Sequence, residues 1–310
     1  MSIKTNSNTT PSSKLIAAIR ENSTPIHPIP TGMKEKLHPQ KGIHAVLFDI
    51  YGTLLVCGIG DIGVSSPGTR SENLQLLLNN SGYPCTLPEK DIPGLLAKVI
   101  REHHKRLREA GTDYPEVDIR EIWAEVLSFL WEQGHLAKKP DEAGIELLAL
   151  RYEMQVNPVW TMPHFPELIP VLLRSGMKLG IVSNAQFYTP LILEALSDSP
   201  LGELGFSPHL CAWSYQQRRA KPSVNLFSAP LQALASMGIS PRETLYVGND
   251  MNNDIAAASV AGCRTCLFAG DKRSLKLEIK DFTKAAEPDI IISCLSQLNS
   301  LIDKEEKYEK

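Results

Sequence analysis

The stretch Ala45-Val46-Leu47-Phe48-Asp49-Ile50-Tyr51-Gly52-Thr53-Leu54 decides the fold of this chain. Four apolar residues, typical of a buried strand, end abruptly in an acid, which a glycine-containing turn and a small hydroxyl follow. At the carboxyl end of a parallel strand, such a carboxylate points into the crevice where open α/β sheets bind ligands. Taken alone, the stretch also fits an ordinary strand followed by an Asp-initiated turn. Polar residues at three later strand ends favour the first interpretation.

The composition sets limits on the classes of protein and partner. The chain has 310 residues and a formal net charge of −3, which allows one large or two modest domains with a real apolar core. This charge gives no global field that would attract nucleic acid or a membrane surface. No apolar run reaches the roughly 18 residues of a membrane-spanning helix. We therefore expect neither nucleic acid nor membrane as a partner, and the sequence leaves the oligomeric state open.

The cysteines favour a reducing compartment. Six are scattered along the chain, and the first residues lack the apolar segment of a signal peptide. We expect a cytoplasmic protein without a disulfide framework. Cys263 and Cys266 have the spacing of a redox or zinc motif, but they lie in an alternating, strand-like run with no second pair nearby. We expect both to be buried thiols.

Composition and periodicity divide the chain into five segments. We expect an amino-terminal arm over 1–42, a first strand and a glycine-dense flap of the core over 43–66, an inserted helical unit over 67–161, the remainder of the core over 162–302, and a charged tail over 303–310. The arm is predicted to lie on the surface or to be partly disordered, since its prolines allow only a short helix. The helical unit contains no strand-like run, and we expect helices alone in it.

Strands and helices alternate after the helical unit. We expect strands over 177–182, 209–213, 244–247, 264–268 and 289–292. Short loops and intervening helices predict a doubly wound, Rossmann-like parallel sheet that is covered on both faces. Pro222 is predicted to lie in the first turn of a helix that runs to Met237.

Four strand ends carry residues suited to one chemistry. Asp49 is a candidate covalent nucleophile, which would divide a difficult hydrolysis into two easier displacements. Ser183 and Asn184 could hold an oxyanion, and Lys221 could balance developing negative charge and keep the nucleophile ionised. Asp250 and Asp254 are hard oxygen ligands that suit Mg²⁺.

In this order, the residues resemble the four motifs of the haloacid dehalogenase-like hydrolase superfamily. The motifs are Asp49-Ile-Tyr-Gly-Thr-Leu54, Ser183-Asn184, Lys221-Pro222 and Gly248-Asn-Asp-Met-Asn-Asn-Asp254. The resemblance implies a Rossmann-like core with Asp49 as the nucleophile. It also implies that the helical unit is a cap, which closes over the site and selects the substrate. Thr53, Ser183 and Asn184 would then orient the oxygens of a small anionic substrate.

Tyr51 departs from the pattern of the phosphatases that the chain resembles. Those enzymes have a second aspartate at this position, as general acid and base for the leaving alcohol. A phenol with a pKa near 10 is a poor substitute at neutral pH. Haloacid dehalogenases are similar to this chain here, since they have a tyrosine, and a halide leaves without a proton.

The fourth motif favours a metal-dependent phosphatase instead. Asp250-x-x-x-Asp254 fits the family's metal-binding spacing, whereas dehalogenases of this type need no metal. The resemblance implies a Mg²⁺ site that uses Asp49, the backbone carbonyl of Tyr51, Asp250 and Asp254. Counted from Gly248, the first acid of the motif would fall on Asn249, so Asn249 and Asp250 remain alternatives. Asp254 is either an indirect ligand or the partner that orients Lys221.

Three hypotheses for function follow. The leading one is a Mg²⁺-dependent phosphatase that acts on a small phosphate ester through an aspartyl-phosphate on Asp49. The second is a 2-haloacid dehalogenase, which would need an arginine for the substrate carboxylate or the halide, with Arg70 and Arg101 as candidates. The third is a catalytically idle binding protein that kept the fold.

Overall fold

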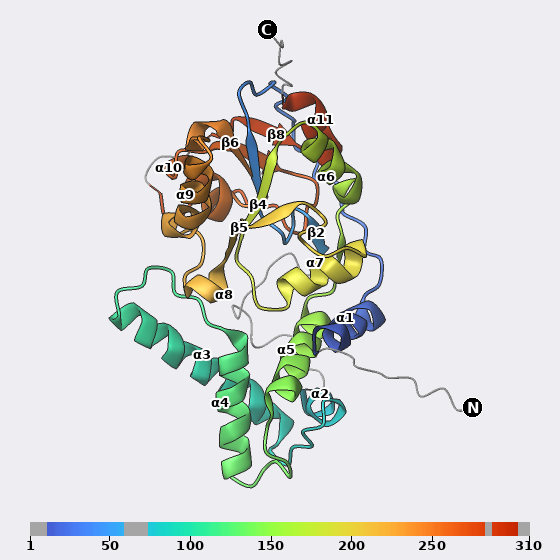
Figure 1. Cartoon of the computed structure of the whole chain (residues 1–310). Helices are drawn as coiled ribbons and strands as arrows, with labels where there is room; N and C mark the ends of the chain where they lie inside the picture. The colour runs from blue at the N-terminus through green and yellow to red at the C-terminus, as the bar shows by residue number, and fades with distance from the viewer. Residues whose placement is uncertain (1–10, 59–73, 283–286, 303–310) are drawn as a thin grey trace, which may run out of the picture.

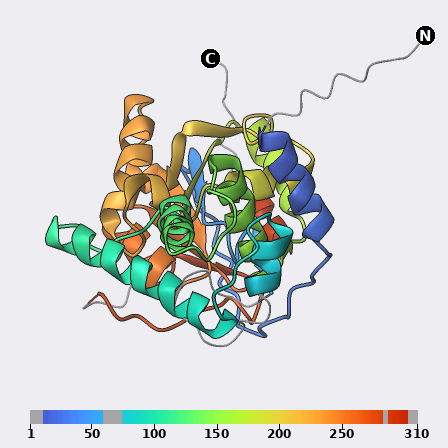
Figure 2. The ribbon, with the colours of Figure 1, turned by 90° about the horizontal axis from the view of Figure 1, so that it is seen from below.

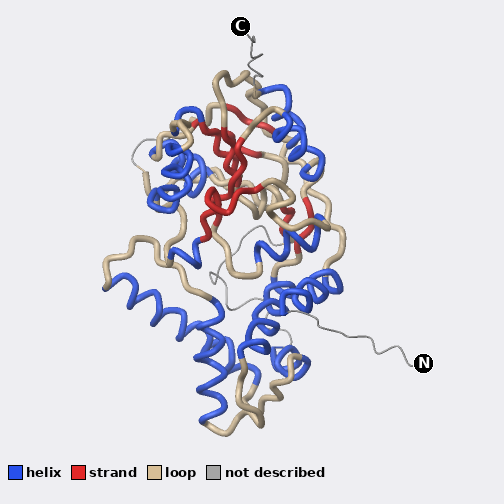
Figure 3. Tube along the Cα trace, in the orientation of Figure 1, coloured by secondary structure: helices blue, strands red, loops and turns tan. Residues whose placement is uncertain are grey.

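A six-stranded parallel sheet lies at the centre of the molecule, with helices on both sides (Figures 1 and 3). The computed structural model describes residues 11–58, 74–282 and 287–302. The strand order is β5-β4-β1-β6-β7-β8, and every neighbouring pair is parallel. The strands are β1 Ala45–Phe48, β4 Lys178–Ser183, β5 Phe206–Trp213, β6 Thr244–Gly248, β7 Arg264–Phe268 and β8 Ile290–Ile292. The predicted α/β fold is confirmed.

Alternate residues of the strands build two apolar layers. Ala45 and Leu47 of β1 pack with the side chains of the helices on one face, and Val46 and Phe48 belong to the cluster on the other face. The core helices are α6 Phe165–Arg174, α7 Thr189–Ser197, α8 Ser214–Gln217, α9 Ser228–Ser236, α10 Ala257–Val260 and α11 Leu298–Leu301. Short 3-10 turns precede or join them at η2 Val224–Phe227, η3 Pro241–Glu243 and η5 Leu295–Gln297. Burial on both faces explains the nearly continuous apolar strands.

Four helices form a separate unit below the carboxyl ends of the strands in Figure 1, and Figure 2 shows this unit from below. They are α2 Leu74–Asn80, α3 Ile92–Glu109, α4 Ile119–Glu132 and α5 Glu142–Val156, with a 3-10 turn, η1 Glu89–Asp91, before α3. Asp118 and Asp141 cap α4 and α5 through their side chains, as their sequence positions indicate. The unit joins the core at Gln186, whose side chain accepts from Ile119 N and donates to Val117 O, both at 2.9 Å.

Two details differ from the sequence-based expectations. The stretch predicted as all helix ends in a strand, β3 Val159–Thr161, which pairs antiparallel with β2 Leu55–Cys57. Three residues are too few to show the alternation of apolar and polar residues that predicts a strand, so the sequence analysis did not predict β3. Pro222 does not open an α-helix, because the chain after it forms the 3-10 turn η2 Val224–Phe227 and α9 begins only at Ser228.

The described part of the amino-terminal arm starts with a helix, α1 Pro11–Asn22, which agrees with the short helix that the prolines of the arm allow. Leu15 and Ile19 are buried where α1 packs against both α5 of the helical unit and α7 of the core. Further along, the backbone of Lys36 exchanges two hydrogen bonds with Ile291 at the edge of the sheet, of 3.0 and 3.1 Å. The arm therefore contacts the helical unit and the core.

Two further expectations concern the cysteines and membrane insertion. Cys263 and Cys266 are buried, as expected, and burial raises the pKa of the Cys263 thiol to about 12. Within the described ranges, no helix combines the length and the apolar character that a bilayer crossing requires.

Candidate active site

The sheet order brings three of the motifs together. β4 and β6 lie on either side of β1, so their carboxyl ends are neighbours. Asp49 directly follows β1, Ser183 ends β4, and Gly248 ends β6. Asp49 also extends the pairing with β6, because its backbone N–H donates to Val247 O at 2.9 Å. Side chains from separate parts of the sequence thus meet at one edge of the sheet.

The carboxylate of Asp49 receives two hydrogen bonds on the same oxygen. Ser183 Oγ donates to Oδ1 at 2.8 Å, and Lys221 Nζ donates to it at 2.7 Å. The hydrogen bonds that the structure gives this carboxylate, within the described part of the chain, all end on Oδ1. Oδ2 is therefore the oxygen of this carboxylate that is left for a further partner.

Lys221 joins two acids and a phenol. Its Nζ also donates to Asp254 Oδ1 at 2.6 Å and lies 3.0 Å from the hydroxyl of Tyr246. The other oxygen of Asp254 accepts from the backbone N–H groups of Asn249 and Asp250, at 3.0 and 2.9 Å. Asp254 is thus occupied on both oxygens, and it lies where the partner orienting Lys221 would lie.

Tyr246 is a site residue that the sequence analysis missed. Its hydroxyl lies 2.8 Å from Val182 O and 3.0 Å from Asp254 Oδ1, and the side chain is fully buried. Because Tyr246 lies inside an apolar strand, its sequence context predicts a core residue. A buried tyrosine hydroxyl usually has a hydrogen-bond partner, but the sequence does not identify that partner.

Burial and neighbouring charge set the protonation of the cluster. Burial raises the pKa of Asp49 to about 6, with Lys221 lowering it and Asp254 raising it further. Burial alone would lower the pKa of Lys221, but Asp254 and Asp49 outweigh burial and raise it. Lys221 therefore stays protonated near neutral pH, and the carboxyl group of Asp49 loses its proton near pH 6.

Asn184 and Thr53 brace the site through protein contacts. The side-chain oxygen of Asn184 accepts from Lys221 N at 2.7 Å, and its amide group donates to Lys221 O at 3.3 Å. Thr53 Oγ1 donates to Asn249 Oδ1 at 3.0 Å. Asn184 therefore fixes the backbone from which Lys221 reaches Asp49.

Gly52 lets the first and fourth motifs approach each other. It has a φ of +83°, and a Cβ atom there would lie only 2.7 Å from Asn249 Nδ2. Only glycine tolerates both the left-handed conformation and this contact. Asn249 thereby packs directly under the turn that follows Asp49.

The hydroxyl of Tyr51 is buried and hydrogen-bonded within the protein. The hydroxyl lies 2.9 Å from Thr189 Oγ1, inside the protein. Burial, and then the carboxylate of Glu153, raise the pKa of Tyr51 well above its ordinary value. A phenol in this state neither donates nor accepts a proton readily at neutral pH, which agrees with the expectation from the sequence.

Asp250 begins the helix after β6. That helix, η4 Met251–Ala256, has π geometry, and Asp250 Oδ1 accepts from the backbone N–H groups of Asn252 and Asn253, both at 2.8 Å. Lys276 Nζ lies 3.9 Å from Asp250 Oδ2. Lys276 had no role in the sequence analysis, because it belongs to none of the motifs. Burial and Asp254 raise the pKa of Asp250.

The candidate site has few side chains that could bind a metal ion. Within the described residues, no group of three or more His, Cys, Asp and Glu side chains is arranged to hold a metal ion. The remaining oxygen donors are Oδ2 of Asp49, the backbone carbonyl of Tyr51, and Asp250 Oδ2 or Asn249 Oδ1. The last two each accept one hydrogen bond among the described residues, from Asn253 Nδ2 and Thr53 Oγ1 respectively. This set fits Mg²⁺, which keeps several waters and is often held by only one or two carboxylates.

Of the two arginines considered for a substrate carboxylate, the structure describes Arg101. Arg101 is exposed on α3, and Arg70 lies outside the described residues. Arg218 and Arg219 instead form ion pairs with Glu121 and Asp113 of the helical unit and its adjoining loop.

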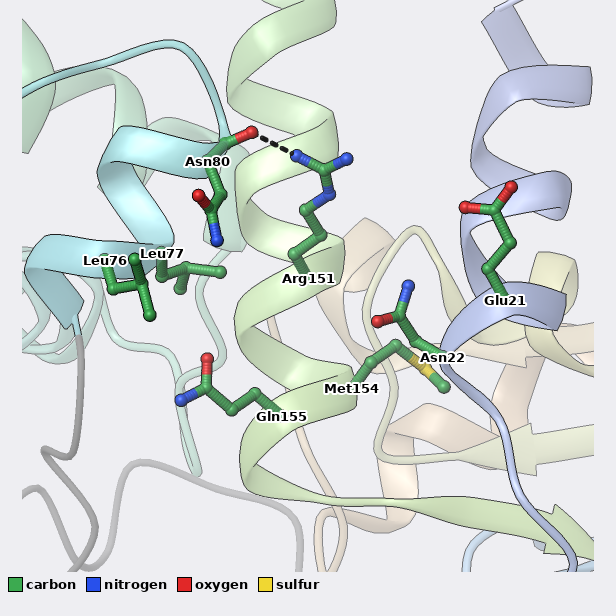
Figure 4. A pocket seen from close by; sticks show the side chains of 8 residues that line it. All are labelled: Glu21, Asn22, Leu76, Leu77, Asn80, Arg151, Met154 and Gln155. Atoms are coloured by element: carbon green, nitrogen blue, oxygen red, sulfur yellow. Dashed lines mark hydrogen bonds between the residues drawn. The ribbon is translucent and has the colours of Figure 1, made fainter.

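A pocket of about 790 Å³ lies elsewhere, between α1, α2 and α5 (Figure 4). Glu21, Leu76 and Arg151 line it from the three helices. None of the predicted site residues is among its lining residues, so it is separate from the candidate active site.

Comparisons with known proteins agree with the motifs. Residues 43–262 match the model of the haloacid dehalogenase-like hydrolase family. Phosphoglycolate phosphatase from Escherichia coli (strain K12) is 34% identical over 150 residues, which cover 47% of this chain and 52% of the relative. The chain thus spans about half the length of this curated relative.

A solved structure that aligns with a TM-score of 0.50 shows the same fold. 2-Haloacid dehalogenase from Pseudomonas syringae pv. Tomato DC3000 aligns with a TM-score of 0.50 and 17% identity, over 84% of this chain and 97% of that one. A predicted phosphoglycolate phosphatase from Haemophilus somnus 129pt aligns with a TM-score of 0.44 and 17% identity, over 84% and 97%. The match to the family model covers well over half of the sequence, and the chain belongs to the haloacid dehalogenase-like hydrolase family.

Proposed function

We propose that this hydrolase is a Mg²⁺-dependent phosphatase that acts on a small phosphate ester through an aspartyl-phosphate on Asp49. The observation that carries the proposal is the contact of Asp49 Oδ1 with Lys221 and Ser183. These bonds fix the carboxylate through Oδ1 and leave Oδ2 without a hydrogen bond from the described residues. A carboxylate held in this way is pre-oriented for attack, and its neighbouring cation can balance charge on the reacting group.

The reaction consists of two displacements at phosphorus. In the first, Asp49 Oδ2 forms a bond to phosphorus, and the bond to the ester oxygen breaks with its electron pair staying on the leaving group. In the second, water attacks phosphorus, the bond to Asp49 breaks, and phosphate leaves. Lys221 and Ser183 hold Asp49 through both steps, and Asp254 keeps Lys221 in place. This division into two steps lowers each barrier.

The proposed Mg²⁺ would be held by Asp49, the backbone carbonyl of Tyr51 and Asp250, with Asn249 as the alternative to Asp250. When bound, it would neutralise negative charge on the phosphoryl oxygens. Asp254 is proposed to act on this site indirectly, since both of its oxygens already accept hydrogen bonds from Lys221 and the backbone.

The missing acid limits the leaving groups. Tyr51 replaces the aspartate that would protonate the leaving alcohol, and burial raises the pKa of its hydroxyl. The leaving group must therefore be stable as an anion or take its proton from water. We expect slow turnover that is fastest on esters with acidic leaving groups.

The relatives support a small, anionic substrate. The Escherichia coli protein that matches this chain is named a phosphoglycolate phosphatase, and a phosphate ester of that size is the substrate class we propose. We place the reaction in the cytoplasm, in line with the thiols of the six free cysteines.

A 2-haloacid dehalogenase is the second candidate, and Tyr51 is the observation that favours it. A halide leaves without a proton, so dehalogenation does not need a general acid at this position. Asp49 would then form a carboxylate ester with the substrate, and water would hydrolyse it. This alternative lacks a described arginine that meets the substrate carboxylate at the site.

The test is hydrolysis of para-nitrophenyl phosphate by the purified protein, with Mg²⁺ and with EDTA, beside Asp49→Asn. Its leaving group needs little protonation, so Tyr51 does not prevent release. Metal-dependent release that disappears in Asp49→Asn supports the phosphatase. Absence of release, together with halide formation from 2-chloropropionate, would support the dehalogenase, and inactivity on both would point to an idle binding protein.

A further inference from the structure

Lys221 lies inside a four-residue turn. Ser223 N donates to Ala220 O at 3.0 Å and closes the turn, with Lys221 and Pro222 between the two ends. The place of the lysine ammonium at the candidate active site therefore depends on how the turn is held. From the core, Asn184 bonds to the backbone N–H and carbonyl groups of Lys221, in the middle of the turn.

The connection between α3 and α4 of the helical unit holds both ends of this turn. Ala220 N donates to Tyr114 O at 2.8 Å, and Ser223 Oγ donates to Asp113 Oδ2 at 2.7 Å. The side chain of Ser223 is buried, and among the described residues Asp113 is the partner of its hydroxyl. A buried hydroxyl that loses its partner is costly. Two adjacent residues of the helical unit thus fasten the first and last residues of the turn that carries Lys221.

The same contact continues as a short antiparallel pairing. Glu116 N donates to Arg218 O at 3.1 Å, and Pro115 forms a β-bridge with Arg219. In Figure 1 the connection between α3 and α4 passes next to α8, which directly precedes this loop. Residues 113–116, which we call the connector, therefore lie along the loop that leads into the turn.

Tyr114 fastens the connector to a second segment, beside the fourth motif. Its hydroxyl donates to Asp281 Oδ1 at 2.8 Å, and Asp281 Oδ2 accepts from Asn252 Nδ2 at 2.8 Å. The φ of Tyr114 is +44°, in the left-handed region that residues other than glycine rarely adopt. Such a backbone persists where the surrounding structure determines it. The bonds of its carbonyl and its hydroxyl supply these constraints, so the connector is held between the turn and the fourth motif.

We propose that the connector is a positioning element for Lys221, with Asp113 and Tyr114 as positioning residues that act through the turn of residues 220–223. The inference rests on the proposed phosphatase function, in which Lys221 holds Asp49 through both displacements. It gives the helical unit a part in the alignment of the nucleophile. A misplacement of about 1 Å at a reacting group can cost a large part of the rate. Loss of the connector's contacts should therefore lower kcat.

The experiment compares Asp113→Ala with Asp91→Ala in the hydrolysis of para-nitrophenyl phosphate. Asp91 is a matched control, because it is an exposed acid of the same helical unit whose side chain makes no capping hydrogen bond. For Asp113→Ala we expect kcat to fall about tenfold with KM within about twofold, since alignment is lost and substrate binding is not. Asp113→Asn keeps an oxygen acceptor for Ser223 and should recover most of kcat. Asp91→Ala should resemble the unaltered protein in both constants.

A double-mutant cycle tests the route through Ser223. Ser223→Ala removes the hydroxyl that Asp113 holds. If Asp113 acts through this bond, adding Asp113→Ala to Ser223→Ala should lower kcat by less than about twofold further. A further loss as large as that of Asp113→Ala alone would overturn the role of Asp113 as we propose it.

Hydrogen exchange of the backbone amides separates the inference from the proposed function, because it needs no turnover. In Asp113→Ala the amide of Ala220 should exchange about fivefold faster, while the helices of the helical unit exchange as before. If the unaltered protein does not hydrolyse para-nitrophenyl phosphate, the phosphatase proposal fails, whereas faster exchange confined to the turn still supports the connector as the element that holds it. Exchange that is faster throughout the helical unit, or equal in Asp113→Ala and Asp91→Ala, would overturn the positioning role. An active protein in which those two variants have equal kcat would overturn it as well.

Discussion

Nζ of Lys221 lies 2.7 Å from Oδ1 of Asp49, and the two side chains are only 3% and 10% exposed. A buried pair of this kind contributes little net stability, because removing two charges from water costs about as much as their attraction returns. The pair matters for stability mainly when only one of its two partners is removed. If one partner is removed, the other is left as an uncompensated charge inside the protein.

Replacing the cation by an apolar side chain of similar length should therefore destabilise the fold. For Lys221→Met we expect the free energy of unfolding at pH 7 to fall by about 3–5 kcal/mol, since Asp49 and Asp254 lose their shared counter-charge. Hydrolysis should disappear as well. Urea denaturation measures the first effect. Lys105→Met is the control, because that lysine is a surface residue whose side chain is 67% exposed, and its loss should change stability by less than about 0.5 kcal/mol. Equal stability of the two variants would contradict the buried-pair account.

The pH dependence of hydrolysis should report Asp49. Burial raises the pKa of its carboxyl group to about 6, and only the carboxylate attacks phosphorus. The value of kcat/KM should therefore increase about tenfold between pH 5 and pH 7, as the group loses its proton. The assay contains Mg²⁺ below its saturating concentration, and saturating Mg²⁺ should move the increase to lower pH, because a cation favours the ionised form. Two aryl phosphates with different phosphate pKa values serve as the check. An increase that follows the substrate's own pKa would assign the titration to the substrate.

The sequence predicted the core strands well, because their pattern is local. Strand β1 was expected at the residues where it is found, and β7 likewise. Short apolar runs that alternate with helices through short loops predict a parallel sheet from the sequence alone. By contrast, β3 is only three residues long, and such a strand depends on its partner β2 more than on its own period.

The contacts between motifs were less predictable. The position of Asp254 in the sequence left two roles open, and only the fold reveals its bonds to Lys221 and Tyr246. Tyr246 and Lys276 belong to no motif, and they reach the site through pairings between distant segments. Hydrogen bonds across more than twenty residues leave no periodic signal in a single sequence.

Tyr51→Phe tests whether the phenol takes part in proton transfer. The hydroxyl contacts Thr189 and has a raised pKa, so its loss should cost about 1 kcal/mol of stability and leave catalysis almost unchanged. The measurement is kcat on a series of aryl phosphates with increasing leaving-group pKa. Without an acid, the rate should fall steeply along the series, and the variant should follow the same line as the unaltered protein. A variant that slows only on the poorest leaving groups would identify Tyr51 as the acid.

Gly248→Ala should disturb the Lys221–Asp254 contact without removing a charge. A Cβ atom at position 248 would lie 2.5 Å from Asp254 Oδ2, the oxygen that accepts from the backbone of Asn249 and Asp250. Asp254 must then shift, and Lys221 loses one of its two carboxylate partners. We expect kcat to fall at least tenfold and stability to fall by about 1–3 kcal/mol, as is typical of overpacking in a rigid interior.

Gly94→Ala separates this steric effect from the general effect of replacing a glycine. Gly94 lies in α3, and a Cβ atom there meets no other atom within 4 Å. Alanine favours a helix over glycine by about 0.5–1 kcal/mol, so this variant should be slightly more stable and equally active. If both substitutions left kcat unchanged, the position of Asp254 would not matter for turnover, and its proposed role in holding Lys221 would be wrong. If Gly248→Ala alone lost activity while Lys221 kept its raised pKa by NMR titration, the loss would not arise from the Lys221–Asp254 contact. The NMR titration therefore decides whether the substitution acts through Lys221, and Gly94→Ala accounts for the general effect of replacing a glycine.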